Sequence, residues 1–357
     1  MSGGVDSSVA AYLLKKEGFD VVGLTFRGWP QDCRSLVEDK CCGPQAVADA
    51  RMVAHSLGIP HYVVDEIDTF RREVMDYFTA EYRRGRTPNP CVICNEKVKF
   101  GSLLRKAQAL GAERIATGHY ARIRKRRADG EEQKQEKCEL WRARDQQKDQ
   151  SYFLFSLLQD QLARVIFPLG ELTKAEVRAI AKKIGLKTYG KEESQEICFV
   201  PENDYRRFLR ESGVAEKTGE IVTSDGRVLG QHGGIHNFTI GQREGLKIGG
   251  LRQPLYVVGL DAAYNRVVVG TNDELRRGEF DVADCVWHID ADEPEPLQCQ
   301  VKVRSNAEAI PAKVFCSDRS SKNSSTVCLM KPQRAITPGQ AAVFYQKDLV
   351  IGGGWIC

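Results

Sequence analysis

Residues 1–200 alternate helix-like and strand-like segments, and this alternation is the strongest constraint on how the chain folds. Stretches with apolar residues at helical spacing are separated by short runs rich in β-branched residues. Such a pattern predicts an α/β domain with a parallel sheet and helices on both of its faces. The expected helices cover 9–16, 44–57, 70–84, 98–110, 151–164 and 174–184, and the expected strands cover 20–26, 61–65 and 114–117. A charged, hairpin-like insertion with a polar tip is expected over 122–144.

The pattern changes after about residue 200, where glycines cluster and helical periodicity is lost. Short alternating runs separated by Gly and Pro turns then predict a small antiparallel barrel. These runs cover 255–258, 266–269, 285–288, 299–303, 312–316, 326–330 and 341–345. We therefore expect three domains: an α/β domain over 1–200, a small central domain over 201–262 and a β-barrel over 263–357.

Composition narrows the class of protein. A chain of 357 residues that is 42% hydrophobic has enough apolar material for two or three cores, which excludes disorder as the main state. No apolar run approaches the length of a membrane span, and the polar N-terminus is not a signal peptide, so we expect a cytoplasmic protein. A net charge of +4 excludes a purely electrostatic nucleic-acid coat but allows a local basic surface.

The N-terminus has the composition of an anion-binding loop. The string Ser2, Gly3, Gly4, Val5, Asp6, Ser7 and Ser8 directly precedes a predicted helix. Glycines allow close backbone approach, the first N–H groups of a helix point at an anion, and Asp6 could hold Mg²⁺. The Lys of the common phosphate loop is absent, and a solvated Gly/Ser-rich tail is the simpler alternative.

The full string followed by a helix resembles the pyrophosphate loop of ATP-dependent adenylating enzymes, which cleave ATP between its α and β phosphates. Such a loop normally follows the first strand of the sheet. We therefore expect that the sequence as given lacks about one strand, ~5–6 residues, before Met1, and that a chain beginning there binds ATP weakly.

Twelve cysteines in a chain without a secretory signal are not expected to form a disulfide framework. Cys91 and Cys94 form a C-x-x-C pair before a predicted helix that contains lysines, a setting that favours thiolates, and Cys198 is a third candidate. A structural zinc site needs four ligands, whereas three cysteines suit an iron–sulfur cluster with one open iron or a persulfide relay. The others are expected to be ordinary thiols: Cys33, Cys41, Cys42, Cys138, Cys285, Cys299, Cys316, Cys328 and Cys357.

Seven strings together resemble one family, the tRNA-specific 2-thiouridylases of the MnmA/TrmU type, over the whole length of the chain. They lie at 2–8, 85–100, 116–120, 148–153, 197–199, 236–246 and 337–340. The resemblance implies an N-terminal adenylation domain, a small central domain and a C-terminal β-barrel. It also implies that ATP adenylates the C2 oxygen of the wobble uridine, which sulfur then replaces, giving 2-thiouridine, AMP and pyrophosphate.

The resemblance also implies roles for single residues. Ser2 to Ser7 would hold ATP together with Phe26 and Gly118. Cys198 would carry the transferred sulfur as a persulfide, and Cys94 would resolve it as a disulfide. Asn89, Pro90 and Cys91 would face the target base. The remaining tRNA contacts would come from His119, Lys148, Asp149, Gln150, Arg304, Ser305 and Gln340.

One position departs from the family pattern. Many members have Asp where this chain has Cys91, and a thiol cannot replace a carboxylate in acid–base chemistry. The substitution completes a cysteine trio like that of related sulfur transferases with a 4Fe-4S cluster on three protein ligands. We therefore favour a cluster on Cys91, Cys94 and Cys198, with the persulfide/disulfide route as the competing mechanism.

The implied partners are a tRNA anticodon stem-loop, whose target base leaves the stack, and a sulfur donor. The donor could be a persulfide carrier, a cysteine desulfurase or sulfide, and we expect the enzyme to be a monomer. Two alternatives remain at this point. One is an amidating or amino-acid-ligating enzyme with the same loop, and the other is a non-catalytic RNA-binding or zinc-binding module.

Overall fold

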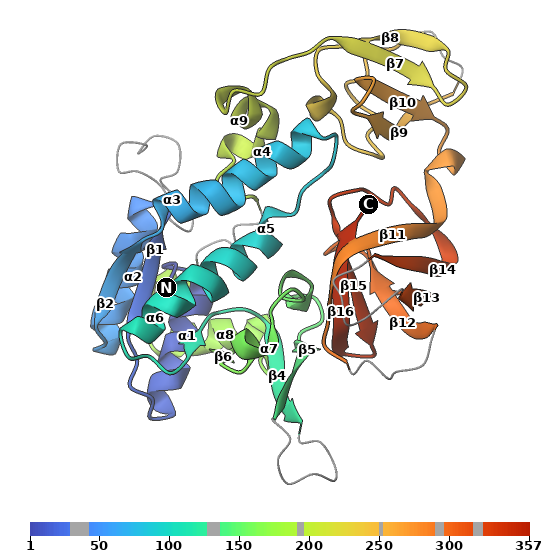
Figure 1. Ribbon diagram of the computed structural model, residues 1–357. Coiled ribbons are helices and arrows are strands. Elements are labelled where there is room, and N and C mark those ends of the chain that lie inside the picture. The colour runs from blue at the N-terminus through green and yellow to red at the C-terminus, as the bar shows by residue number, and fades with distance from the viewer. Residues whose placement is uncertain (29–42, 127–135, 191–195, 250–252, 290–295, 317–323) are drawn as a thin grey trace. The chain divides into compact units, whose positions relative to one another are not determined.

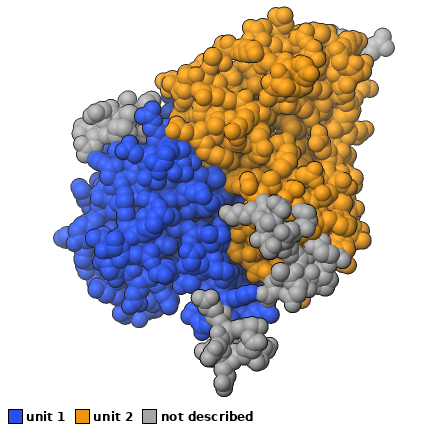
Figure 2. Space-filling model, viewed as in Figure 1, with its two compact units in different colours: residues 1–75, 91–203, 348–350 blue, residues 76–90, 204–347, 351–357 orange. Residues whose placement is uncertain are grey.

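The computed structural model describes residues 1–357 except 29–42, 127–135, 191–195, 250–252, 290–295 and 317–323 (Figure 1). Most of the expected hairpin tip lies outside the described residues, as do Cys33, Cys41 and Cys42. The chain divides into two compact units (Figure 2). Unit 1 comprises 1–75, 91–203 and 348–350, and unit 2 comprises 76–90, 204–347 and 351–357.

The strands of the α/β part of unit 1 pair in parallel, as the alternating pattern predicts. β1 (Gly23–Arg27) pairs with β2 (His61–Asp65), with Gly23 opposite His61. β3 (Ile115–Ala116) pairs with β6 (Val165–Ile166). The parallel α/β architecture is therefore confirmed, and the described strands form two separate pairs.

Two helices of the α/β part have nearly the bounds that the sequence predicts, because the residues at their ends form strong caps. α2 (Pro44–Leu57) has the predicted bounds, because Pro44 occupies its first turn and Gly58 ends it in the left-handed conformation with φ of 59°. α8 (Lys174–Lys183) begins after Thr173, whose hydroxyl accepts a hydrogen bond from the Glu176 N–H in a capping box.

The remaining helical segments between residues 1 and 110 are more broken than expected. They are α1 (Val5–Lys16), α3 (Ile67–Phe70), η2 (Arg71–Met75), α4 (Asp76–Arg83), α5 (Pro90–Ile93), η3 (Cys94–Ser102) and α6 (Leu103–Ala109). Both η2 and η3 are π-helical, a local widening that often accompanies functional sites.

The expected helix over 151–164 is wrong. The structure has a 3₁₀ turn, η4 (Ser151–Phe153), and a single α-turn, α7 (Gln159–Leu162). Tyr152, Leu154 and Leu157 are fully buried, so the segment is apolar without the one-sided face of a surface helix. Two more short 3₁₀ segments complete the unit: η5 (Lys187–Gly190) and η6 (Pro201–Asn203).

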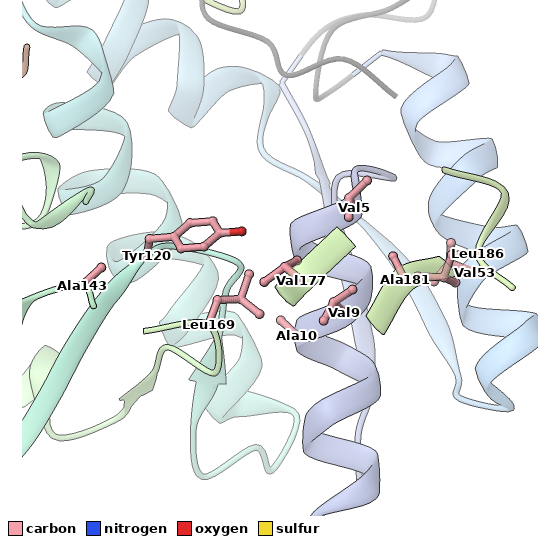
Figure 3. Packing of buried hydrophobic residues seen from close by; sticks show 10 residues of the cluster. All are labelled: Val5, Val9, Ala10, Val53, Tyr120, Ala143, Leu169, Val177, Ala181 and Leu186. Carbon is pink, nitrogen blue, oxygen red and sulfur yellow. The ribbon is translucent and has the colours of Figure 1, made fainter. Parts of the chain in front are cut away.

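An apolar core fixes α1 against α8 (Figure 3). Val5, Val9 and Ala10 of α1 pack with Val177 and Ala181 of α8. Val53, Tyr120, Ala143, Leu169 and Leu186 complete the cluster. The core therefore holds the N-terminal loop, the segment around Tyr120 and the start of α8 in fixed positions relative to one another.

The insertion is a hairpin, as predicted, formed by β4 (Ala121–Arg126) and β5 (Lys137–Arg142). β5 also pairs with Leu349 and Val350, the short C-terminal piece that belongs to unit 1.

Unit 2 contains the helix α4 described above, a second helix, α9 (Tyr205–Glu211), and a four-stranded sheet. The sheet order is β8 (Val228–His232), β7 (Gly219–Thr223), β10 (Arg266–Gly270) and β9 (Tyr256–Asp261). Placing the runs 255–258 and 266–269 in the C-terminal barrel was therefore wrong, since they correspond to β9 and β10, and β10 pairs with β7 and β9. Two 3₁₀ turns accompany the sheet, η7 (Ile235–Asn237) and η8 (Asp273–Leu275).

The C-terminal part of unit 2 is a closed antiparallel barrel, as predicted. Its order is β11 (Arg276–Trp287), β14 (Ser325–Arg334), β13 (Ile310–Cys316), β12 (Leu297–Lys302), β15 (Ala341–Gln346) and β16 (Leu349–Ile356), and β16 pairs back onto β11. Within the described part of the chain, no helix has the length and apolar character needed to cross a membrane.

Candidate functional site

The N-terminal loop is a compact turn at the start of α1, with its serine hydroxyls tied to its own backbone. Ser7 and Ser8 donate hydrogen bonds to the Gly4 carbonyl at 3.3 and 2.8 Å, and the two hydroxyls of Ser2 and Ser7 lie 3.3 Å apart. No side chain caps the N-terminus of α1. This is the arrangement that leaves helix N–H groups directed at an anion.

Two glycines make this loop possible. Gly3 has φ of +67°, and a Cβ there would lie 2.6 Å from the Asp49 Cβ of α2. A Cβ on Gly118 would lie 2.7 Å from the Asp6 carbonyl carbon and the Ser7 nitrogen. The segment after β3 therefore packs directly on the backbone of the loop at Gly118.

Asp6 is held by two side chains from distant parts of the sequence. Lys174 Nζ lies 2.7 and 2.8 Å from the two carboxylate oxygens, and the Tyr120 hydroxyl donates to Oδ1 at 2.8 Å. Sequence reasoning missed Lys174, which lies 168 residues from Asp6 and has no motif of its own.

Asp6 is compatible with a role in holding Mg²⁺, because that ion is usually held by one or two carboxylates together with substrate phosphates. Over the residues that the structure describes, no three His, Cys, Asp or Glu side chains form a group that could hold a metal without a substrate.

Aromatic rings connect the predicted ATP site with the segment of Cys198. Phe26, at the end of β1, lies 6.1 Å from the ring of Phe70, which in turn makes an edge contact with Phe199 at 5.8 Å. Phe70 and Phe199 are almost completely buried. This packing anchors the residue after Cys198 to the strand end that carries Phe26.

The three candidate cysteines differ in exposure: Cys91 is exposed, Cys198 is half-buried and Cys94 is buried. Cys94 begins the π-helical segment η3, in which the Asn95 amide donates to the Phe153 carbonyl at 3.0 Å and Lys99 donates to Asn95. Because the described residues contain no three-ligand metal group, the trio is not assembled here as cluster ligands.

The other described cysteines have the character of ordinary thiols. Burial raises the pKa of Cys285 to about 11 and that of Cys299 to about 12, and it also raises the pKa of Cys138. A raised pKa keeps a thiol protonated and unreactive at neutral pH. This supports setting these cysteines apart from Cys91, Cys94 and Cys198.

His119 lies next to Gly118 on the segment that packs against the loop. Its Nδ1 is 2.8 Å from the Thr117 hydroxyl, and its ring touches Phe100 and Phe167. Burial, with a smaller effect of the Lys99 charge, holds the pKa of His119 well below its usual range. The lowered pKa favours the neutral imidazole, which can serve as a hydrogen-bonding group.

The segment 148–150 makes mostly internal contacts. The Gln150 side chain accepts from the Tyr120 N–H at 3.0 Å, and Asp149 accepts from the Ala143 N–H at 3.0 Å and from the Ser151 hydroxyl at 2.9 Å. These contacts tie the segment to Tyr120 and hence to the loop. Lys148 donates its N–H to the Asp145 carbonyl at 3.1 Å.

Two of the residues that the resemblance implies to face the base, Asn89 and Pro90, lie in unit 2, and both are buried. The loop before them is bound to the barrel: the Gln340 amide donates to the carbonyls of Thr87 and Pro88 at 3.0 and 3.1 Å. Arg304, beside Ser305, donates to the Ala335 carbonyl and the Thr337 hydroxyl at 2.6 and 2.8 Å.

The basic residues of the hairpin are largely matched by acids of the same unit. Arg122 pairs with Glu171 and Asp348, and Lys125 pairs with Glu136 at 2.6 Å. Arg124 lies 4.5 Å from the ring centroid of Trp141. Only part of this face is therefore available for phosphate groups.

Family models match almost the whole chain. The "tRNA methyl transferase HUP domain" covers residues 1–202, the "tRNA methyl transferase PRC-barrel domain" covers 206–271 and the "Aminomethyltransferase beta-barrel domain" covers 277–356. A solved structure described as a "predicted subunit of tRNA methyltransferase" from Methanocaldococcus jannaschii matches 54% of this chain and 91% of its own at 18% identity and a TM-score of 0.26.

Curated relatives are much more similar. The tRNA-specific 2-thiouridylase MnmA of Solibacter usitatus is 49% identical, over 100% of this chain and 97% of the relative. The MnmA proteins of Geobacter metallireducens and Chloroflexus aurantiacus are 50% and 48% identical, over 100% of this chain and 95% and 96% of their own lengths. The chain therefore belongs to the MnmA family of tRNA-specific 2-thiouridylases.

Proposed function

We propose that this protein uses ATP to convert the wobble uridine of tRNA to 2-thiouridine, with release of AMP and pyrophosphate. The observation that carries the proposal is the anion-binding loop at the start of α1, with Gly118 packed on its backbone, in the unit that also contains Cys94 and Cys198. A loop of this kind serves phosphate chemistry, and thiols serve sulfur chemistry.

The first step is adenylation of the base. The C2 oxygen of uridine attacks the α-phosphorus of ATP, the bond to the β-phosphate oxygen breaks, and pyrophosphate leaves. Ser2 to Ser7, Phe26 and Gly118 hold ATP in this proposal, and the loop N–H groups stabilise the charge of the departing pyrophosphate. Asp6 would hold the Mg²⁺ that accompanies ATP, and that ion would neutralise phosphate charge.

The second step is sulfur transfer. The terminal sulfur of a Cys198 persulfide attacks C2, the C2–O bond breaks and AMP leaves. The Cys94 thiolate then attacks Cys198 Sγ, so that the electron pair of the cleaved S–S bond stays on the thiocarbonyl sulfur and a disulfide forms between the two cysteines. A thiol reductant restores both thiols, and a persulfide donor or sulfide with an oxidant reloads Cys198.

A 4Fe-4S cluster on Cys91, Cys94 and Cys198 is the other route for sulfur. Cys91 replaces the Asp of many relatives and completes the trio, but the described residues form no three-ligand metal group. The proposed sulfur transfer therefore uses the thiols of Cys94 and Cys198. Anaerobic reconstitution decides between the routes: about four iron and four sulfide per chain, lost in Cys91→Ser, would favour the cluster.

The tRNA would be recognised through its anticodon stem-loop. Asn89, Pro90 and Cys91 are proposed to face the flipped base, and the other proposed contacts are His119, Lys148, Asp149, Gln150, Arg304, Ser305 and Gln340. An unpaired loop base is cheaper to extrude than a paired one, which fits an enzyme that acts on an anticodon.

Mass spectrometry of tRNA after incubation with ATP, Mg²⁺ and either a persulfide donor or sulfide with an oxidant tests the proposal. The wild-type chain should form 2-thiouridine at the wobble position, and Cys94→Ser and Cys198→Ser should abolish it. Cys328→Ser, on barrel strand β14, is the control that should retain activity. If the wild-type chain forms no 2-thiouridine but converts ATP to AMP in a reaction that depends on ammonia or an amine, and both active-cysteine variants retain that reaction, an amidating or ligating enzyme is favoured instead.

A further inference from the structure

The N-terminal loop lacks its own lysine, yet a lysine reaches it from another part of the fold. Lys174 Nζ lies 2.7 and 2.8 Å from the Asp6 oxygens and 5.7 Å from the ring centroid of Tyr120. The side chain of Lys174 is only 11% exposed, whereas that of Asp6 is 32% exposed. The cation therefore lies inside the loop site and not on an outer surface.

The position of Lys174 is unfavourable for the helix that carries it. It is the first residue of α8, where the positive end of the helix dipole repels a cation. The capping box of Thr173 and Glu176 stabilises this end of the helix without the Lys174 side chain. The backbone N–H of Lys174 adds a hydrogen bond, which it donates to the Asp145 carboxylate at 2.9 Å. The lysine side chain is thus not needed for α8 to form, and it contacts Asp6 and Tyr120 of the loop site.

The core of unit 1 aims this side chain at the loop. Val177 and Ala181, one and two turns after Lys174, pack on Val5 and Val9 of α1 (Figure 3). Because α1 and α8 share this core, the start of α8 is held at a fixed distance from the start of α1. A lysine stem can move its charge by several ångströms without any movement of either helix.

We propose that Lys174 is the phosphate-binding cation of this loop, exchanging the Asp6 carboxylate for the β- and γ-phosphate oxygens when ATP binds. In the ligand-free protein, Asp6 keeps the ammonium group in place and compensates its charge. On binding, Lys174 pairs with the part of ATP that leaves as pyrophosphate, and the Asp6 carboxylate becomes available to the divalent cation. The inference rests on the proposed use of ATP and adds a residue that the loop motif does not contain.

Calorimetric titration of the full chain with ATP, AMP and pyrophosphate, each with Mg²⁺, tests this role. Lys174→Gln should weaken ATP and pyrophosphate binding about tenfold or more, the range for loss of a charge-assisted hydrogen bond, and leave AMP binding within about twofold. Lys174→Arg should recover part of the loss. Lys182→Gln, an exposed lysine on the same helix, should match the wild type.

Three results would contradict either the proposed role of Lys174 or the proposed function. An equal loss of AMP and ATP binding in Lys174→Gln would show that Lys174 only shapes the loop, and unchanged binding of pyrophosphate would also overturn the proposal. If the wild-type chain neither binds ATP nor forms AMP with tRNA, the proposed function itself fails.

Lys174→Gln could unfold because Asp6 is left without its cation. In that case the single variant Asp6→Asn is compared with the double variant Asp6→Asn/Lys174→Gln. Neither of these variants has an unpaired carboxylate at position 6. The same selective loss of pyrophosphate binding is expected, and its absence would overturn the proposal.

Discussion

The side-chain amide of Gln340 donates hydrogen bonds to two consecutive carbonyls, those of Thr87 and Pro88, across a separation of more than 250 residues. The Thr87 N–H donates in turn to the Pro338 carbonyl at 2.8 Å, and a Cβ on Gly339 would lie 2.9 Å from the Thr87 oxygen. The barrel thus fixes the loop that leads into Asn89 and Pro90. Gln340 has a positioning role here whatever it contributes to tRNA binding.

Gln340→Ala should therefore impair the reaction through the position of this loop. Leaving two part-buried carbonyls without their donor should lower the free energy of unfolding by about 1–3 kcal/mol. The rate of 2-thiouridine formation should fall, while ATP affinity stays unchanged because the ATP loop lies in unit 1. Urea denaturation and single-turnover assays check this, with the exposed Gln298→Ala as the control. Wild-type stability in Gln340→Ala would contradict the prediction.

Gly118→Ala should damage the proposed ATP site specifically. The new methyl group would lie 2.7 Å from backbone atoms of Asp6 and Ser7, which cannot move away as a flexible side chain could. Overpacking of this kind costs about 1–3 kcal/mol, and here the displaced atoms belong to the loop itself. ATP binding should weaken markedly. Gly190→Ala, where a Cβ meets nothing within 4 Å, should bind ATP normally, and equal behaviour of the two variants would contradict this account.

His119 should make stability depend on pH. Burial lowers its pKa in the folded protein, so its neutral form is favoured there, while the unfolded chain gains a proton near its usual pKa of about 6.5. The contribution of His119 to the free energy of unfolding is therefore complete above that pH. It is lost as the pH falls below that value, by up to about 1.4 kcal/mol per pH unit. Burial lowers the pKa of His61, His232 and His236 in the same direction.

Urea denaturation at pH 7.5 and 5.5 measures this effect. His119→Gln should reduce the difference in unfolding free energy between the two pH values, whereas His55→Gln, on the exposed face of α2, should not. If His119→Gln keeps the full pH dependence, its imidazole is not the part-buried neutral group that its lowered pKa indicates.

The sequence was most informative where one residue decides a local structure. Pro44 and Gly58 define α2 because one fits only the first turn and the other readily adopts a positive φ. The prediction of a helix over 151–164 was wrong because the apolar residues there are not confined to one helical face. Tyr152, Leu154 and Leu157 are all buried, so their spacing carries no helical period. The strand over 266–269 has the same local signal whether it joins the barrel or the central sheet, so only its pairing with β7 and β9 could place it.

The candidate site shows the same limit. The loop string and the C-x-x-C pair are local patterns of residue types, and Gly118 was implied by the family resemblance of the string around it. The contacts of Lys174 with Asp6 and of Gln340 with Thr87 depend on packing between segments 168 and 253 residues apart. No pattern of neighbouring residues contains that information.

The fate of the uridine C2 oxygen tests the central claim most directly. A synthetic anticodon stem-loop carrying ¹⁸O at C2 of the wobble uridine would be incubated with the protein, ATP, Mg²⁺ and the sulfur donor, and the AMP would be analysed by mass spectrometry. Adenylation of that oxygen predicts one ¹⁸O atom in the phosphate of AMP for each 2-thiouridine formed. AMP without ¹⁸O, alongside 2-thiouridine, would contradict the account.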